Sequence, residues 1–130
     1  MKSKLDLIAL LLEDVQAFNQ YRKEYRKETG YEDIDLSYAN LTGANLSYAN
    51  FRWANLDKAN LDGANLIKVD LRYADLRYAN LRWASLRYAD LGSADLSYAN
   101  LTGANLTKAH LTKANFDGAR LAGAKTWAEN

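Results

Sequence analysis

The chain has 130 residues, of which 48% are hydrophobic, and a formal net charge of +1. This length predicts a single domain, and the apolar content is enough to build one continuous core. The sequence contains no cysteine, which excludes disulfides, thiolate metal sites and a cysteine nucleophile. Because 17 Lys and Arg residues are balanced by 16 Asp and Glu residues, the composition favours neither a strongly basic nucleic-acid-binding protein nor a strongly acidic one.

The N-terminal residues include two lysines and then an apolar run from Leu5 to Leu12. A signal peptide has a similar outline, but Asp6 interrupts this run and no cleavage site with small residues follows it at once. The run is also much shorter than the ~20 residues that a membrane span needs. We therefore expect no membrane span, a mature protein that is the whole chain, and a cytoplasmic location.

Residues 1–33 are expected to form an N-terminal helical cap. Their seven acidic and six basic residues do not favour a basic, membrane-binding helix. Gly30 is a stop signal after the cations Arg26 and Lys27, which suit a helix C-terminus. We predict one helix from Lys4 to about Lys27 that covers the end of the repeats. Its apolar face is expected to consist of residues at three- and four-residue steps: Leu5, Ile8, Leu12, Val15, Phe18, Tyr21 and Tyr25.

Residues 34–123 form eighteen consecutive blocks of five residues with the outline Ala-(Asn/Asp)-Leu-x-x. The first position is Ala in sixteen blocks and the third is Leu in sixteen, with Phe51 and Phe116 in the other two. In an α-helix five residues rotate by about 500°, so the leucines would spread around the whole circumference. In a flat β-strand an odd repeat would expose every second leucine. The pattern therefore predicts short extended segments, with Ala and Leu pointing inward, that are separated by turns.

This block sequence resembles the A(D/N)LXX motif of the pentapeptide-repeat family, and the match covers all eighteen blocks. Residues 12–23 are similar to the segment that precedes the repeats in cyanobacterial members. The resemblance implies an all-β solenoid, a right-handed quadrilateral β-helix with four blocks in each coil. Eighteen blocks then make about 4.5 coils, and residues 20 apart lie one above another on adjacent coils.

Stacking with a period of 20 residues arranges the outward side chains in columns. Asp57 falls beside Arg77, and Asp62 beside Arg82, as opposite charges worth at most ~1 kcal/mol each. Trp83 stands alone in a column of glycines, where we expect it either to lie over the glycines or to protrude as a recognition handle. The second-position Asn residues are expected to form an outward polar ladder. Two further columns alternate tyrosine and lysine, which suits cation–π contact: Tyr48, Lys68, Tyr88 and Lys108, and Tyr38, Lys58 and Tyr78.

One coil carries an arginine followed by an aromatic residue on each of its four sides. Such pairs are typical of protein-binding hot spots and of nucleic-acid surfaces. The four sides point in four directions, so the pairs form a belt around the solenoid, and nucleic-acid binding, which needs clustered cations, is not favoured. The candidate interaction surface is this belt: Arg72, Tyr73, Arg77, Tyr78, Arg82, Trp83, Arg87 and Tyr88.

Residue types suited to catalysis or metal binding are few. His110 is the single histidine and occupies a second position, so we interpret it as an exposed ladder residue. Asp70 and Asp90 are expected to stack, as are Asp75 and Asp95, but calcium needs about six to eight oxygen ligands. We therefore predict no catalytic residue, no metal site, no cofactor and no small-molecule substrate.

Residues 124–130 form a C-terminal tail in which the side-chain pattern fails, because Thr126 stands where a block would have Leu. A bare coil end would expose leucine side chains and unpaired backbone groups. We expect either that Trp127 folds back over this end, or that two chains pack end to end there as a weak homodimer.

The predicted function is that of a non-enzymatic scaffold that offers its sides to a partner protein, whose identity the sequence does not indicate. A packed solenoid lacks the concave pocket with convergent polar groups that an enzyme requires. An alternative comes from family members that imitate DNA and bind DNA gyrase. Such imitation needs a strongly acidic surface, whereas residues 34–123 carry ten Lys and Arg residues and eight Asp residues, a net charge of +2. The alternative is therefore disfavoured.

Overall fold

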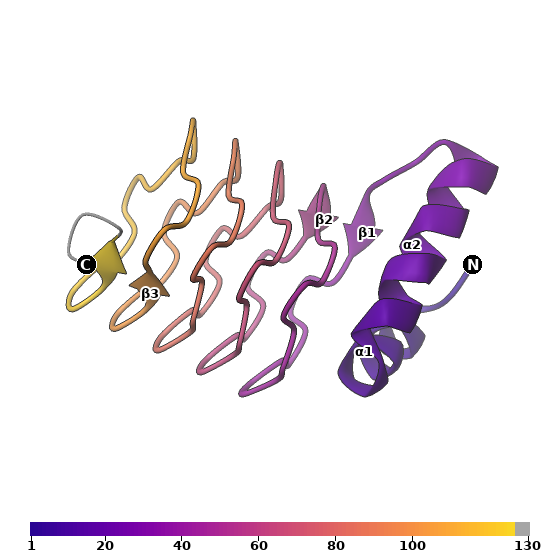
Figure 1. Ribbon diagram of the computed structural model, residues 1–130, viewed down its shortest axis with the longest axis horizontal. Coiled ribbons are helices and arrows are strands. Elements are labelled where there is room, and N and C mark those ends of the chain that lie inside the picture. Colours follow the sequence, from indigo (N-terminus) through magenta and orange to yellow (C-terminus); the bar gives the residue numbers. More distant parts are fainter. Residues whose placement is uncertain (127–130) are drawn as a thin grey trace.

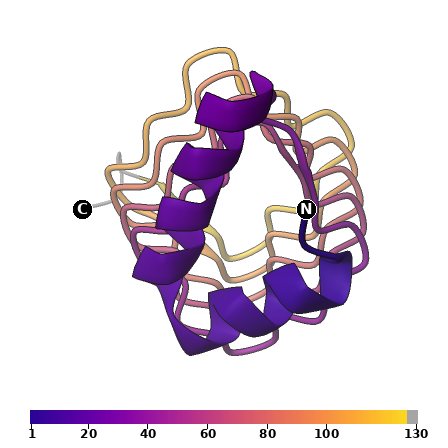
Figure 2. The same cartoon turned by 90° about the vertical axis from the view of Figure 1, so that its right-hand side faces the viewer.

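The computed structural model describes residues 1–126, in which two N-terminal helices precede a stack of coils (Figure 1). Regular strand is confined to short pairs of residues, because each block is extended only between two corners. The two helices cover the N-terminal opening of the stack (Figure 2), and within residues 1–126 no helix covers its other end (Figure 1). The elements are α1 (Lys4–Glu13), α2 (Val15–Thr29), β1 (Ile34–Asp35), β2 (Ala54–Asn55), β3 (Asn105–Leu106) and β4 (Lys125–Thr126).

The prediction of one continuous N-terminal helix is wrong, because the helix breaks at Asp14. This residue has extended backbone angles and ends α1, and its carboxylate accepts a hydrogen bond from the backbone N–H of Ala17 to begin α2. The break changes the helix direction, so no single apolar face runs through both segments. Leu5 and Leu12, which we expected to face inward, are therefore 77% and 53% exposed. Phe18 is buried as predicted, and the other buried apolar residues of the two helices are Leu7 and Leu11, which were not on the predicted face.

Backbone pairing joins residues that are 20 apart, as the resemblance implied, so four blocks complete one coil. Ile34 in β1 pairs in parallel with Ala54 in β2, and Asn105 in β3 pairs with Lys125 in β4. Bridges with the same spacing run through the blocks between them. Pairing continues through Thr126, so the backbone keeps its register three residues beyond the last complete block.

Each block ends in a corner that a hydrogen bond and a left-handed residue define. In the first block the Ala39 N–H donates to the Leu36 carbonyl at 3.1 Å, and Tyr38 between them has a φ of 61°. Positive φ at the third of four turn residues is the geometry of a type II turn, which normally favours glycine. The Tyr38 N–H also donates to the Asp57 carbonyl of the next coil at 3.0 Å, and this pairing holds the residue in place.

The second-position side chains bond mainly within their own blocks, which differs from the predicted ladder. The Asn100 Oδ1 atom, for example, accepts hydrogen bonds from the backbone N–H and the hydroxyl of Thr102 at 3.1 and 2.7 Å. Asn and Asp favour such bonds to the residue two positions on, and here the bonds support the corner. In residues 1–126 the amide ladder is reduced to a bond of 3.2 Å from Asn65 to Asn45.

The interior of the stack is filled by the first- and third-position residues, as predicted. Leu76 and the other mid-stack leucines have no exposed surface, and the alanines beside them are almost completely buried. At the N-terminal end Phe18 of α2 packs edge-on against Phe51, with ring centroids 5.8 Å apart. At the C-terminal end Phe116 is partly exposed and Leu121 is 45% exposed.

Candidate functional site, a basic pocket beside the helical cap

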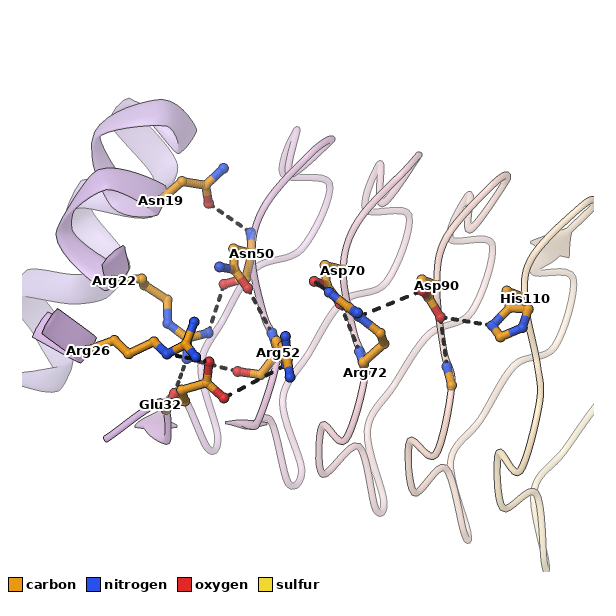
Figure 3. A network of polar contacts seen from close by, with 11 residues as sticks. Asn19, Arg22, Arg26, Glu32, Asn50, Arg52, Asp70, Arg72, Asp90 and His110 are labelled. Carbon is orange, nitrogen blue, oxygen red and sulfur yellow. Dashed lines mark hydrogen bonds and ion pairs between the residues drawn. The ribbon is translucent and has the colours of Figure 1, made fainter. Parts of the chain in front are cut away.

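One side of the solenoid combines polar side chains from successive coils with side chains from the cap. We call it the arginine side, and it consists of blocks 49–53, 69–73, 89–93 and 109–113. A chain of polar contacts follows this side from α2 along the second and fourth positions of the blocks (Figure 3). Where α2 meets the first two coils, the side chains enclose a cavity of about 370 Å³, the basic pocket. It is lined by Gln16, Asn19, Gln20, Arg22, Lys23 and Arg26 of α2, by Glu32, and by Asn50, Arg52, Asp70 and Arg72.

Arg22 forms the inner wall of this pocket and is only 7% exposed. Its guanidinium donates hydrogen bonds to the carbonyls of Asn50 and Arg52, both at 2.8 Å, and to the carbonyl of Glu32 (Figure 3). Burial lowers the pKa of Arg22 to about 10, against the opposing attraction of nearby carboxylates. The side chain therefore stays protonated at neutral pH, and its charge meets backbone carbonyls instead of a paired carboxylate.

The contacts of Asn19 and Arg22 replace those that a preceding coil would make. In the stack a second-position residue receives a bond to its carbonyl and donates one from its N–H to the coil before it, as Asn60 does to Ala39. For the first coil the Asn19 amide oxygen accepts from the Asn50 N–H at 2.7 Å, and Arg22 donates to the Asn50 carbonyl. Side chains of α2 thus satisfy the backbone groups at the open edge of the first coil, which would otherwise be a site of aggregation.

The outer wall of the pocket is an ion-pair network centred on Glu32. Its carboxylate lies 3.0 Å from Arg26 Nε and 3.8 Å from Arg52 Nε. The second distance is too long for a hydrogen bond, and the Arg52 Nε atom is buried without a hydrogen-bond partner. Lys23 is exposed beside this network.

Two arginines of the predicted belt are neutralised inside their own blocks. Arg72 donates to both oxygens of Asp70 at 2.9 and 2.7 Å, and Arg77 donates to both oxygens of Asp75 at 3.0 and 2.9 Å. Burial raises the pKa of each carboxyl, but the hydrogen bonds from the arginine side chain and backbone outweigh it, so the pKa of Asp70 and of Asp75 is lowered. The same bonds raise the pKa of both arginines.

The prediction that Arg77 pairs with Asp57 and Arg82 with Asp62 on adjacent coils is therefore wrong. Within residues 1–126 no ion pair joins Asp57 to Arg77 or Asp62 to Arg82. A bidentate contact inside the block needs no adjustment between coils, and Asp75 is the closer partner for Arg77. The second carboxylate near Arg77 is Asp95, at 4.0 Å on the next coil.

Aromatic side chains stack along the outer corners. On the arginine side Trp53 and Tyr73 lie parallel, with ring centroids 4.4 Å apart. Trp83 lies over Gly103, where an added Cβ would come within 2.4 Å of its ring, so the first of the two alternatives for this indole is confirmed. The predicted cation–π contacts are present for Lys58, between Tyr38 and Tyr78 at 5.3 and 5.8 Å, and for Lys68, between Tyr48 and Tyr88 at 5.5 and 5.9 Å. Within residues 1–126 Lys108 makes no such contact, and Arg87 lies 5.8 Å from the Tyr88 ring.

The residues of the belt do not come together at one place. Arg72 and Tyr73 lie on the arginine side, while the pairs that follow them occupy the other three columns set by the 20-residue pairing. The sequence analysis missed the block of Arg52 and Trp53, although it precedes the block of Arg72 and Tyr73 by 20 residues. It also missed Arg22, since nothing in the helix sequence indicates a buried arginine. Trp127 lies outside the described residues.

His110 continues the polar chain on the arginine side, but it lies on an open surface. Its Nδ1 atom is 3.0 Å from Asp90 Oδ1, and its Nε2 atom is 3.0 Å from the hydroxyl of Thr112. The order of hydroxyl, imidazole and carboxylate is that of a proton relay, yet the His110 side chain is 62% exposed and Asp90 also contacts Arg72 at 3.7 Å. The geometry therefore fits a surface contact, as predicted for this histidine. Among residues 1–126 no three His, Asp or Glu side chains converge so that they could hold a metal ion.

Comparisons with known proteins identify the repeats. The family model for pentapeptide repeats matches residues 34–72, 64–103 and 89–125. A pentapeptide repeat protein of the Arabidopsis thaliana thylakoid lumen is 37% identical over 69% of this chain and 63% of its own, with a TM-score of 0.67. The chain thus spans less than two thirds of the length of that protein.

A second solved structure, Rfr23 from the cyanobacterium Cyanothece 51142, is 28% identical over 85% of this chain and 95% of its own, with a TM-score of 0.55. No curated protein matched the sequence. The described residues include no helix with the length and apolar character to cross a membrane. The solved members imply a right-handed quadrilateral β-helix for the repeats. With matches that extend from residue 34 to residue 125, the chain belongs to the pentapeptide-repeat family.

Proposed function

We propose that this chain is a non-enzymatic scaffold that binds another protein through the sides of its solenoid. The scaffold would consist of a helical cap (1–33), about 4.5 coils of right-handed quadrilateral β-helix (34–123) and a tail (124–130). Its interior is occupied by alanine and leucine side chains, which leaves the outer corners for binding. The belt of arginine and aromatic residues remains the candidate surface, and we extend it on the arginine side to Arg52 and Trp53, one coil before Arg72 and Tyr73.

The observation that carries the proposal is the repeated arginine–aromatic pair on adjacent coils of the arginine side. Trp53 and Tyr73 are 44% and 45% exposed, and their mutual stacking fixes both rings before a partner arrives. Tryptophan, tyrosine and arginine are the residues most enriched in protein-binding hot spots. Preformed aromatic surface also reduces the ordering entropy that binding costs.

The test is capture of a partner from the host, followed by measurement of its affinity for variants of the full chain. Replacing Trp53 and Tyr73 together by serine should weaken binding by roughly tenfold or more, as expected for hot-spot aromatics. Tyr38→Ser is the matched control, because this tyrosine is also exposed but lies outside the belt, in the column of Lys58. Unchanged affinity of the double variant would contradict the proposed surface.

The gyrase hypothesis remains disfavoured by the charge of the surface. The net charge of +2 over the repeats has the wrong sign to imitate phosphate. Arg82 and Arg87 follow Asn80 and Ser85, so no carboxylate of their own block neutralises them. We expect no change in DNA supercoiling by gyrase at micromolar protein, and inhibition or protection of gyrase at that concentration would contradict this expectation.

For the assembly we propose a weak homodimer through the C-terminal coil, and for the compartment the cytoplasm. The dimer is supported by the partly exposed Phe116 and by Leu121, which is 45% exposed. Light scattering should show a mass that rises toward a dimer with concentration, whereas a strict monomer at high concentration would contradict the dimer. The Arabidopsis relative is a thylakoid-lumen protein, so fractionation of the host cells is the direct test of the compartment.

A further inference from the structure

We infer that the basic pocket binds a phosphate group, either as inorganic phosphate or as a phosphate monoester on a larger ligand. This inference is independent of the proposed function, which concerns the aromatic corners of the solenoid. The cavity of about 370 Å³ lies between α2 and the first two coils, and it has charged side chains on both walls (Figure 3). Its size is within the range of small-ligand sites.

The lining residues carry an excess of three positive charges. Five cations face two carboxylates in the pocket: Arg22, Lys23, Arg26, Arg52 and Arg72 against Glu32 and Asp70. Arg72 is neutralised by its bidentate contact with Asp70, and Arg26 by its contact with Glu32 at 3.0 Å. Among the described residues, Arg22 and Lys23 therefore remain without an ion pair, and Arg52 has only its long contact of 3.8 Å with Glu32.

Arg22 makes this excess difficult for solvent to screen. The side chain is 7% exposed, and its three hydrogen bonds go to backbone carbonyls, which carry no net charge. A charge fixed in a poorly solvated wall acts more strongly on its surroundings than an exposed one. The structure thus holds a permanent positive charge behind the cavity, and the bonds to the coil keep it in place.

Arg52 and Lys23 are the groups that can bind the ligand directly. The Nε atom of Arg52 is buried, but its two Nη atoms make no hydrogen bond within the described residues, and its ion pair with Glu32 is long, at 3.8 Å. Lys23 is exposed on α2. Arg52 belongs to the solenoid and Lys23 to the cap, and both line the pocket, so an anion bound to both would join the two parts.

The charge and the arrangement of donors favour phosphate over a carboxylate. A phosphate monoester carries about −1.5 to −2 charges at neutral pH and has three acceptor oxygens. A carboxylate carries one charge and two oxygens in one plane. A planar arginine fork from the solenoid and a lysine from the cap suit a tetrahedral group, which presents oxygens in several directions.

The experiment is isothermal titration of the full chain with sodium phosphate, with O-phosphoserine and with glutarate as a dicarboxylate of similar charge. We expect one binding site for the phosphate compounds. Lys23→Gln and Arg52→Gln should each weaken the affinity by about tenfold, the effect of losing one charged hydrogen bond. Lys113→Gln and Arg120→Gln remove the same charges from exposed positions on the last coil and should change the affinity by less than about twofold.

Comparing phosphate with phosphoserine shows whether the pocket binds the free anion or a phosphate ester, and three other results would contradict phosphate binding. Equal affinity for phosphate and phosphoserine supports a site for the free anion, and preference for phosphoserine supports an ester on a larger ligand. Glutarate binding as tightly as phosphate, equal weakening in the two control variants, or no binding up to about 10 mM would each overturn the inference. Loss of partner binding in the Trp53 and Tyr73 variant does not enter this test, so the two proposals can fail separately.

Discussion

Removing the buried guanidinium tests whether Arg22 joins the cap to the coils. In Arg22→Met the carbonyls of Glu32, Asn50 and Arg52 lose their donors while the aliphatic part of the side chain is kept. Hydrogen bonds from a charged donor contribute roughly 1.5–3 kcal/mol each, so three bonds at the low end amount to about 5 kcal/mol. Burial lowers the pKa of Arg22 to about 10, so the charged guanidinium is itself destabilised in the fold and the three bonds contribute less than their sum. The expected net loss in the free energy of unfolding is about 2 kcal/mol.

Urea unfolding followed by far-ultraviolet circular dichroism measures this loss. Lys23→Met is the matched control, because it removes a neighbouring cation that is exposed on the same helix. Exposed substitutions of this kind change the free energy of unfolding by less than ~0.5 kcal/mol. If the Arg22 and Lys23 variants unfold at the same urea concentration, the hydrogen bonds to the coil edge do not stabilise the protein and the reasoning is refuted.

Two further predictions concern the core and the pH dependence. Leu76→Asp should abolish folding, because it buries an unpaired carboxylate at a position with no exposed surface, while Leu121→Asp at the open end should be tolerated; circular dichroism distinguishes the two. The contact with Arg72 lowers the pKa of Asp70 in the folded protein. The ionised carboxylate therefore stabilises the fold at pH values above the pKa of Asp70 in the unfolded chain, and this stabilisation is lost as the pH falls through the pKa in the folded protein. Urea midpoints measured between about pH 5 and pH 2 should therefore fall less steeply in Asp70→Asn than in the natural sequence, and equal slopes would contradict this assignment.

The sequence predicted the coil because its signal is local and repeated. A five-residue period leaves Ala and Leu only one common direction, and this predicted the core. The 20-residue register, which the backbone pairing confirms, came from the resemblance to the pentapeptide-repeat family. The cap was predicted less well, since the break at Asp14 depends on one capping bond to Ala17 that competes with a continuous apolar pattern. Arg22 was not predicted because its acceptors come from Asn50 and Arg52, far along the chain, and no helix pattern contains them.

The candidate site also shows which of its features a sequence can and cannot specify. The stacking of Trp53 on Tyr73 follows directly from their separation of 20 residues, once the coil length is known. The basic pocket needs α2 as its second wall, and the position of α2 depends on packing between Phe18 and Phe51. Which cations of the pocket are unpaired depends on the bidentate contact between Arg72 and Asp70, and the sequence alone does not predict this contact.

That pair indicates how the second position of a block controls the charge at its fourth position. Where Asp precedes Arg by two residues, as in Asp70 and Arg72, the side chains neutralise each other. Where Asn takes this place, as in Asn50 and Arg52, the Asn oxygen accepts only the backbone N–H of the arginine, at 3.1 Å. The guanidinium is then free to bind another group.

Replacing the Asp of such a block in the basic pocket by Asn should therefore strengthen phosphate binding and lower the free energy of unfolding. Asp70→Asn keeps an acceptor for the backbone of Arg72 but frees its guanidinium, which lies in the basic pocket with Asp90 at 3.7 Å as its remaining carboxylate. We expect phosphate affinity to rise by roughly threefold to tenfold, while the free energy of unfolding at neutral pH falls. Asp75→Asn makes the same change beside Arg77, outside the pocket, and should leave phosphate affinity unchanged. An equal rise in both variants would mean that phosphate responds to total charge, and the pocket would then have no specific role.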